Sequence, residues 1–261
     1  MMSLRSIAVI ARMTLLEAIR NRLLLVGISF SVVLVIMSLA AASISIFERE
    51  RLIIDVGLAA ASAFGSVIAI GLTIATFASE LRQRTAYVTL SRPLPRHAFV
   101  LGKYLGVILA MVGVVTLMIL ATAMTVFVFG GHLSSAFWGS LFLAWLEMAV
   151  ACAIATLFST LSSPVIAATY SAGLVLAGNL SMEFLWVADR FEKQENIWGA
   201  ELMRIFHRMI PNLDKLSLRA QAANHLEIPY SYVAMGGLYA FLYSFTLLLI
   251  AVLVFRRRRH L

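Results

Sequence analysis

The sequence is poor in charged residues and in cysteine, and both shortages narrow what the chain can be. Only 13% of its 261 residues are charged and 61% are hydrophobic, whereas soluble proteins carry roughly 25% charged residues. This balance excludes an ordinary soluble domain and predicts an all-α membrane protein with several spans. The single cysteine, Cys152, lies in an apolar run, so it forms no internal disulfide and is expected to be an inert buried thiol.

Motifs for metal binding and catalysis are also missing. The five histidines are scattered, and no H-E-x-x-H or C-x-x-C spacing occurs, so neither a metal site nor a catalytic residue is predicted. Gly102-Lys103 comes nearest to a phosphate-binding loop, but Tyr104 follows where Ser or Thr is required. The chain itself is therefore expected to bind no ATP, Mg²⁺ or other cofactor and to be no enzyme.

Long apolar runs predict six transmembrane helices in a single domain, 1–261. A span needs about 20 apolar residues to cross about 30 Å of hydrocarbon, and the first run is too long for a cleaved signal peptide. The expected spans are Leu23–Ile46, Val56–Ser79, Tyr104–Phe129, Phe137–Phe158, Pro164–Val187 and Ser231–Phe255. Before them, residues 1–22 alternate apolar side chains and arginines at helical spacing. This predicts an interfacial amphipathic helix, which is either a charged flank only or a docking element.

The positions of Lys and Arg predict the orientation of the spans. Cations concentrate in residues 1–22, in the 80–103 loop and in Arg256–Arg259, whereas the opposite side carries most of the acids. By the positive-inside rule, both termini and the 80–103 loop are expected in the cytoplasm of a multi-pass cell-membrane protein. Topology thus explains the formal charge of +8 more simply than nucleic-acid binding does.

The 188–230 segment is the only sizeable piece expected outside the cytoplasm, and it is predicted to form short external helices. One helical face up to Pro211 carries the apolar residues Trp198, Leu202, Ile205 and Met209. A helix lying in the outer membrane interface fits this pattern. Asn212 is placed to cap a second short helix over 213–223.

Small residues recur every four positions in three of the spans. They are Gly57, Ala61, Gly65 and Ala69; Gly102, Gly106 and Ala110; and Gly236, Ala240 and Ser244. Such lines let helix backbones approach closely in lipid, and packing within the chain explains most of them.

Polar residues inside the spans are the candidate functional residues. A line of hydroxyls on the second span, leading to Glu80, consists of Ser62, Ser66, Thr73 and Thr76. Hydroxyls in a span face protein or a cavity, so this line is either a packing surface or an interface or translocation surface. Glu147 and Glu183 are further candidates, because ionisable groups in a bilayer are costly, and the polar residue Asn179 lies one turn before Glu183. A buried contact with a hydrogen-bonding partner also explains Glu147, and interfacial water also explains Glu183.

The basic loop between the second and third spans carries a pattern typical of a known family. The pattern consists, in order, of an acidic residue, basic residues, Thr, an apolar run, Pro, Arg and Gly-Lys-x-x-Gly. The residues are Glu80, Arg82, Arg84, Thr85, Pro95, Arg96, Gly102, Lys103 and Gly106, with Pro93 close by. Broader matches are E-x-x-R-N-R ending at Arg22, P-N-L at 211–213 and F-R-R-R from Phe255. The chain resembles the permease subunits of type-2 ATP-binding-cassette (ABC) exporters, and most of all the branch of multicopper-enzyme maturation permeases.

This resemblance implies a subunit that exports an unidentified, amphiphilic or lipid-linked substrate, powered by ATP and Mg²⁺ on a separate cytoplasmic ATPase. It also implies pairing with a second permease copy or a paralogue in membrane lipid, with the second and fifth spans at the dimer interface. The residues that would couple the ATPase to the helices are Glu80, Arg82, Arg84, Thr85, Pro93, Pro95 and Arg96.

Two other hypotheses stay open beside the resemblance. One is a self-contained secondary transporter or channel, although the spans show few ionisable groups and no inverted repeat. The other is a membrane anchor for an enzyme-maturation complex, which would need neither the hydroxyl line nor a gated exit.

Overall fold

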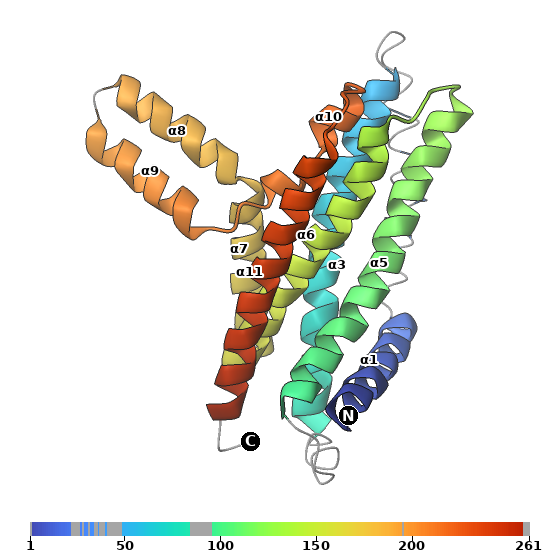
Figure 1. Cartoon of the computed structure of the whole chain (residues 1–261), viewed down its shortest axis with the longest axis vertical. Helices are drawn as coiled ribbons and strands as arrows, with labels where there is room; N and C mark the ends of the chain where they lie inside the picture. Colours follow the sequence, from blue (N-terminus) through green and yellow to red (C-terminus); the bar gives the residue numbers. More distant parts are fainter. Residues whose placement is uncertain are drawn as a thin grey trace.

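The computed structural model describes residues 2–21, 49–83, 96–194 and 196–257, together with isolated positions between 27 and 40. All the elements in these ranges are helices (Figure 1). They are α1 (Met2–Arg20), α3 (Arg49–Gln83), α5 (Arg96–Val128), α6 (Ser135–Leu161), α7 (Pro164–Asn179), α8 (Ser181–Lys193), α9 (Ile197–Met209), the 3-10 helix η1 (Asp214–Leu216), α10 (Arg219–Ala223) and α11 (Tyr230–Arg257). The all-α prediction is confirmed for the described residues.

Within the described ranges, four helices are long and apolar enough to cross a membrane. They comprise Arg49–Ala78, His97–Val128, Ser135–Leu161 and Tyr230–Arg256, which match the second, third, fourth and sixth expected spans. The first expected span lies almost entirely outside the described residues. The total of six spans therefore stays a prediction, whereas several membrane-spanning helices are established.

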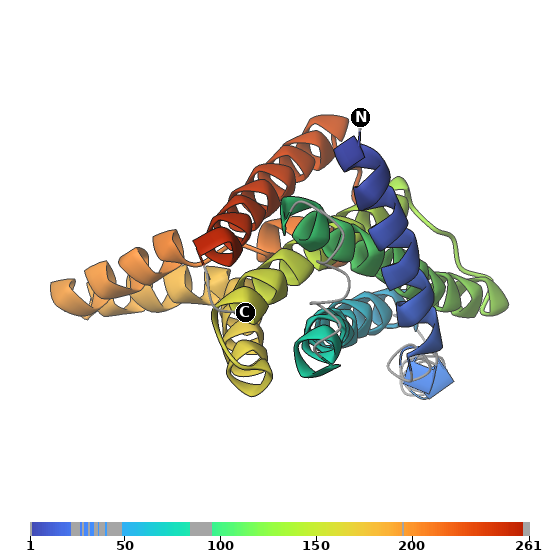
Figure 2. The same cartoon turned by 90° about the horizontal axis from the view of Figure 1, so that it is seen from below.

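The fifth expected span is not the continuous helix that the apolar run predicts. It breaks after Asn179, and α8 leaves α7 at an angle of 61°. The 16 residues of α7 rise about 24 Å, less than the roughly 30 Å of a hydrocarbon core. Helices α8 and α9 lie side by side and project from the bundle on the side opposite α1 (Figures 1 and 2).

Contacts with the segment before α11 fix the bend between α7 and α8. A Cβ on Gly178 would lie 2.7 Å from the carbonyl oxygen of Pro211, so only glycine allows this close approach. The amide of Leu213 donates a hydrogen bond to the Gly178 carbonyl at 3.2 Å. The chain after α9 is therefore fastened to the end of α7.

The small-residue lines lie at contacts between helices of the same chain, as predicted. A Cβ on Gly57 would overlap Thr122 of α5, and one on Gly65 would lie 3.1 Å from the Met148 sulfur of α6. On α11, a Cβ at Gly236 would lie 2.8 Å from Leu143. Glycine at these places lets α3 and α11 approach α5 and α6 more closely than larger residues would.

Helix α1 docks along the first turns of α5. A Cβ on Gly102 would lie 2.7 Å from the Ile10 Cβ, and one on Gly106 would lie 2.6 Å from the Ala11 carbonyl oxygen. Ala11, Thr14 and Ala18 are buried. Helix α1 therefore packs against α5, while its location at the membrane interface and any role beyond a charged flank stay predictions.

The first and last described helices reach the same end of the bundle. The start of α1, the end of α11, the end of α3 and the start of α5 all lie there (Figure 1). The expected 80–103 loop is shorter than predicted, because residues 80–83 belong to α3 and residues 96–103 to α5. Regular helix thus extends from the spans towards residues 84–95, which lie outside the described ranges.

Candidate functional site

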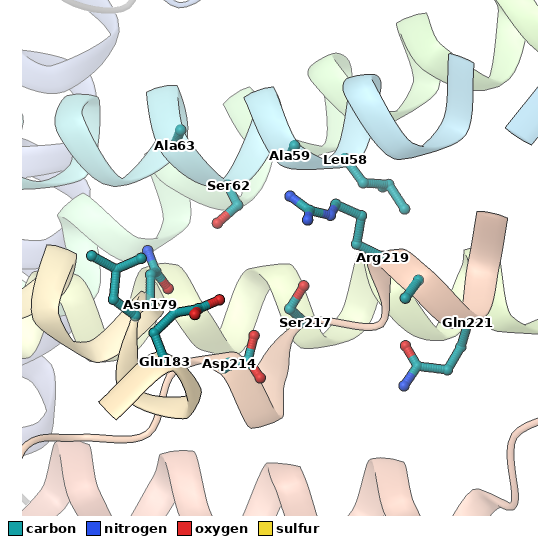
Figure 3. Close-up of a pocket in the computed structure, with 12 residues that line it drawn as sticks. Leu58, Ala59, Ser62, Ala63, Asn179, Glu183, Asp214, Ser217, Arg219 and Gln221 are labelled. Atoms are coloured by element: carbon teal, nitrogen blue, oxygen red, sulfur yellow. The ribbon is translucent and has the colours of Figure 1, made fainter. Parts of the chain in front are cut away.

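A polar cavity of about 430 Å³ lies between α3, the bend from α7 to α8, η1 and α10 (Figure 3). Its volume falls in the range of about 300–1,000 Å³ that is usual for ligand pockets. The lining residues are Leu58, Ala59, Ser62, Ala63, Asn179, Leu180, Glu183, Asp214, Ser217, Arg219, Ala220 and Gln221. The side chains of Ser62, Asn179, Glu183 and Ser217 reach into one space from separate elements (Figure 3).

The segment between α9 and α11 supplies one wall of the cavity. The Asn212 side chain accepts a hydrogen bond from the Lys215 amide at 3.2 Å, and the Asn212 amide donates to the Tyr239 hydroxyl at 2.9 Å. Asn212 therefore bonds to the start of η1, whose N-cap is Leu213, and the expected helix over 213–223 is split into η1 and α10. The break at Ser217 and Leu218 turns the chain so that Asp214 and Arg219 both face the cavity.

A recess of about 20 Å³ adjoins the cavity and ends at Glu147 of α6. It shares Leu58, Ser62, Ser217 and Arg219 with the cavity, so the two spaces are neighbours. Glu147 is only 2% exposed. The Ser62 hydroxyl donates a hydrogen bond to its carboxylate at 2.6 Å, and the Asn179 side chain is a second polar partner.

Acidic groups dominate the charge around the two spaces. Among the described residues, Glu147, Glu183 and Asp214 line them, whereas Arg219 is the one lining cation and pairs with Asp55 at 2.9 Å. Burial raises the pKa of Asp214 above its ordinary value, an effect that Arg219 opposes and Glu183 adds to. The cavity thus favours a positively charged or proton-donating occupant.

The hydroxyl line on α3 does not act as a single surface. Ser62 reaches the cavity, whereas Ser66 is buried and its hydroxyl has no hydrogen-bond partner among the described residues. Thr73 donates to the Ala69 carbonyl at 2.7 Å, and Thr76 donates to the Thr73 carbonyl at 2.8 Å. The two threonines are therefore packing residues that bond to their own helix.

Lys103 is buried in the bundle, although the sequence places it at the end of a cytoplasmic loop. It is 1% exposed, and its Nζ donates to the Thr76 carbonyl of α3. The same Nζ lies 5.5 Å from the ring centre of Phe77 and 5.3 Å from that of Phe99, in the range of cation–π contacts. Lys103 therefore ties the start of α5 to the last turns of α3.

The expected ATPase-coupling residues are only partly described. Glu80 and Arg82 lie in the last turn of α3, and Arg96 is the first residue of α5. Arg84, Thr85, Pro93 and Pro95 lie outside the described residues. Their coupling role stays a prediction.

Sequence reasoning missed the residues that the segment before α11 contributes. Asp214, Ser217, Arg219 and Gln221 line the cavity, but none belongs to a recognisable motif or to an apolar span. The available signal was the presence of Asp and Arg close together after Pro211, where a helical pattern stops.

A second cluster missed by sequence reasoning joins loops at the end of the bundle where α3 begins. The Glu50 carboxylate accepts a hydrogen bond from the His132 amide at 2.8 Å and lies 3.3 Å from the His225 Nε2. These contacts connect the start of α3 with the α5–α6 loop and with the chain after α10.

These features define a polytopic helical membrane protein with polar residues gathered inside its bundle. Residues 8–256, nearly the whole chain, match the family described as ABC-2 family transporter protein. The chain therefore belongs to that family and is a permease subunit of an ABC transporter, a class whose members associate with an ABC ATPase. The resemblance seen in the 80–106 pattern is confirmed at this level. A comparison with curated protein sequences finds no match.

Proposed function

We propose that the chain is the membrane subunit of an exporter in the cell membrane, with both termini in the cytoplasm. Its cargo is an amphiphilic or lipid-linked molecule, and ATP is hydrolysed with Mg²⁺ on a separate ATPase chain. The family match over residues 8–256 carries this proposal. The position of the polar cavity beside α10, away from the chain ends, supports outward movement (Figure 1).

The coupling segment in this proposal extends from Glu80 to Arg96. Helix α3 is continuous from Arg49 to Gln83, so a displacement of its last turn also moves Ser62 at the cavity. The distance from Thr76 to Ser62 along the helix is about 21 Å at 1.5 Å per residue. Lys103, which bonds to the Thr76 carbonyl, makes the start of α5 move together with α3. Rigid helices of this kind transmit a push at one end as a shift at the other.

A second permease copy or a paralogue is expected to pack against α3 and α7. Ala63 on α3 and Leu180 after α7 line the cavity, and both are exposed. Val67 and Leu176, 67% and 66% exposed, extend this apolar surface along the two helices. A partner bound there would close the open side of the cavity. We also propose that the chain is a member of the multicopper-enzyme maturation branch. This membership does not identify the substrate.

The proposal is tested by purifying the chain with the ATPase encoded beside it and measuring ATP hydrolysis in nanodiscs. We expect the two chains to co-purify and the hydrolysis rate to differ from that of the ATPase alone. An ATPase that neither co-purifies nor changes its rate would contradict the proposal. It would shift support to the channel or membrane-anchor hypotheses.

A further inference from the structure

The recess beside Glu147 has the size of one small polar group. Its volume of about 20 Å³ compares with the roughly 10–15 Å³ needed to hold a single water. The recess has both apolar and polar walls, and its polar lining residues are Ser62, Ser140, Glu147, Ser217 and Arg219. A molecule in the larger cavity can therefore extend one compact terminal group to Glu147.

The charges of the cavity call for a cation in that place. Among contacts between described residues, Arg204 pairs with Glu192 and Arg219 with Asp55, and the His225 ring nitrogen lies close to the Glu50 carboxylate. None of them includes Glu147, Glu183 or Asp214. A carboxylate buried in a membrane helix is costly unless a cation or a proton compensates it. Ser62 and Asn179 supply polar contacts to Glu147 but no positive charge, and Arg219, which also lines the recess, pairs with Asp55 rather than with Glu147.

We propose that the cavity and its recess bind a primary ammonium group, with the Glu147 carboxylate as its acceptor. An ammonium group is a compact point charge with three donors. It suits a water-sized recess lined by a carboxylate and hydroxyls, whereas a trimethylammonium group is too bulky to enter. The rest of the molecule would occupy the 430 Å³ cavity beside Glu183 and Asp214. That the bound molecule is cargo rests on the proposed function, whereas the binding itself does not.

Two sources supply this group, an ethanolamine lipid headgroup and a soluble amine. The first arm of the test titrates the purified full-length chain in detergent with phosphatidylethanolamine or phosphatidylcholine of the same acyl chains. The second arm uses ethanolamine and choline. The thermal unfolding midpoint reports binding in both arms. The two members of each pair differ only in the methyl groups on nitrogen, so the comparison isolates the fit to the recess.

We expect the primary ammonium member to bind at least about tenfold more tightly, a ratio that corresponds to roughly 1.4 kcal/mol. Glu147→Gln, which keeps the size but removes the charge, is expected to abolish this preference. Glu201→Gln on α9, outside the cavity, is the matched control and should retain it. A preference in the lipid arm alone identifies a headgroup, and one in the amine arm identifies a soluble ligand.

Two results would overturn the proposal. One is the absence of discrimination in both arms, and the other is a preference that survives in Glu147→Gln. If Glu147→Gln fails to fold, Glu183→Gln at the exposed edge of the cavity takes its place. We expect this variant to lose ammonium affinity severalfold. Unchanged ammonium affinity in Glu183→Gln would contradict the proposal. The binding assay contains no ATPase, so its result does not depend on ATPase coupling. If the nanodisc experiment shows no coupling but the ammonium preference is intact, only the proposed transport function is overturned.

Discussion

The docking of α1 on α5 predicts a large effect from one added methyl group at Gly106. The Cβ of Gly106→Ala would lie 2.6 Å from the Ala11 carbonyl oxygen and 2.6 Å from the Thr14 Cβ. Each distance is about 0.8 Å short of ordinary van der Waals contact at 3.4 Å. Both atoms are fixed by the backbone of α1, so a side-chain rotation cannot relieve the overlap and the helix must withdraw. Overpacking of this kind costs about 1–3 kcal/mol.

That cost corresponds to a roughly 5- to 150-fold shift in the equilibrium between docked and undocked α1. Hydrogen–deuterium exchange of α1 peptides measures this shift directly. Gly113→Ala is the matched control on the same helix, because nothing lies within 4 Å of its added Cβ. We expect faster exchange in α1 for Gly106→Ala and wild-type exchange for Gly113→Ala. Equal protection in the two variants would refute the docking of α1 through this contact.

Three further predictions concern α3 and the cavity. Ser66→Leu should destabilise the chain by about 1–3 kcal/mol, because Ser66 is 4% exposed and a larger side chain overpacks the site. Val67→Leu, at an exposed position, is the control and should not destabilise the chain. Equal unfolding midpoints for the two variants would contradict the prediction. Asp214→Asn should raise the unfolding midpoint at neutral pH, because burial raises the pKa of Asp214 and the folded chain resists its ionisation. This gain should vanish as the pH falls below about 4, where the carboxyl is protonated in both folded and unfolded chains; a gain independent of pH would contradict the assignment. Asp55→Asn breaks the exposed pair with Arg219 and should lower the free energy of unfolding by less than about 1 kcal/mol. A larger decrease in a denaturation experiment would show that the pair is more than a surface contact.

Helical periodicity predicted the helix that ends just before Pro211 well. Trp198, Leu202, Ile205 and Met209 all lie on α9, and all four are exposed. Their common face follows from the 3.6-residue repeat, which is a local property of the sequence. The small-residue lines were predictable for a similar reason, because close helix contacts in lipid require small side chains.

The bend after Asn179 was not predictable from the apolar run. Hydropathy continues across it, and the contacts that fix it join Gly178 to Pro211 and Leu213, more than 30 positions later. The same long-range contacts bring Asp214 to the cavity. Local patterns carry no information about such pairings.

The candidate site was partly predictable from the cost of polar groups in lipid. Ser62, Glu147 and Glu183 were expected on this ground, and Asn179 from the family resemblance, and the fold brings all four together around the cavity and its recess. It was less informative for the threonines of α3. A hydroxyl in a helix can bond to a carbonyl three or four residues earlier, so its presence in a span does not require a cavity.

The central claim is that a separate ATPase drives this permease through the segment from Glu80 to Arg96. The most direct test compares ATP hydrolysis by the complex in nanodiscs for wild type, Glu80→Ala and Arg84→Ala, with Arg208→Ala on α9 as the control. The account predicts normal membrane insertion in all three variants, loss of the permease-dependent change in rate for the first two, and a wild-type rate for Arg208→Ala. Wild-type rates in both Glu80→Ala and Arg84→Ala would contradict it and leave the loop as a topology signal only.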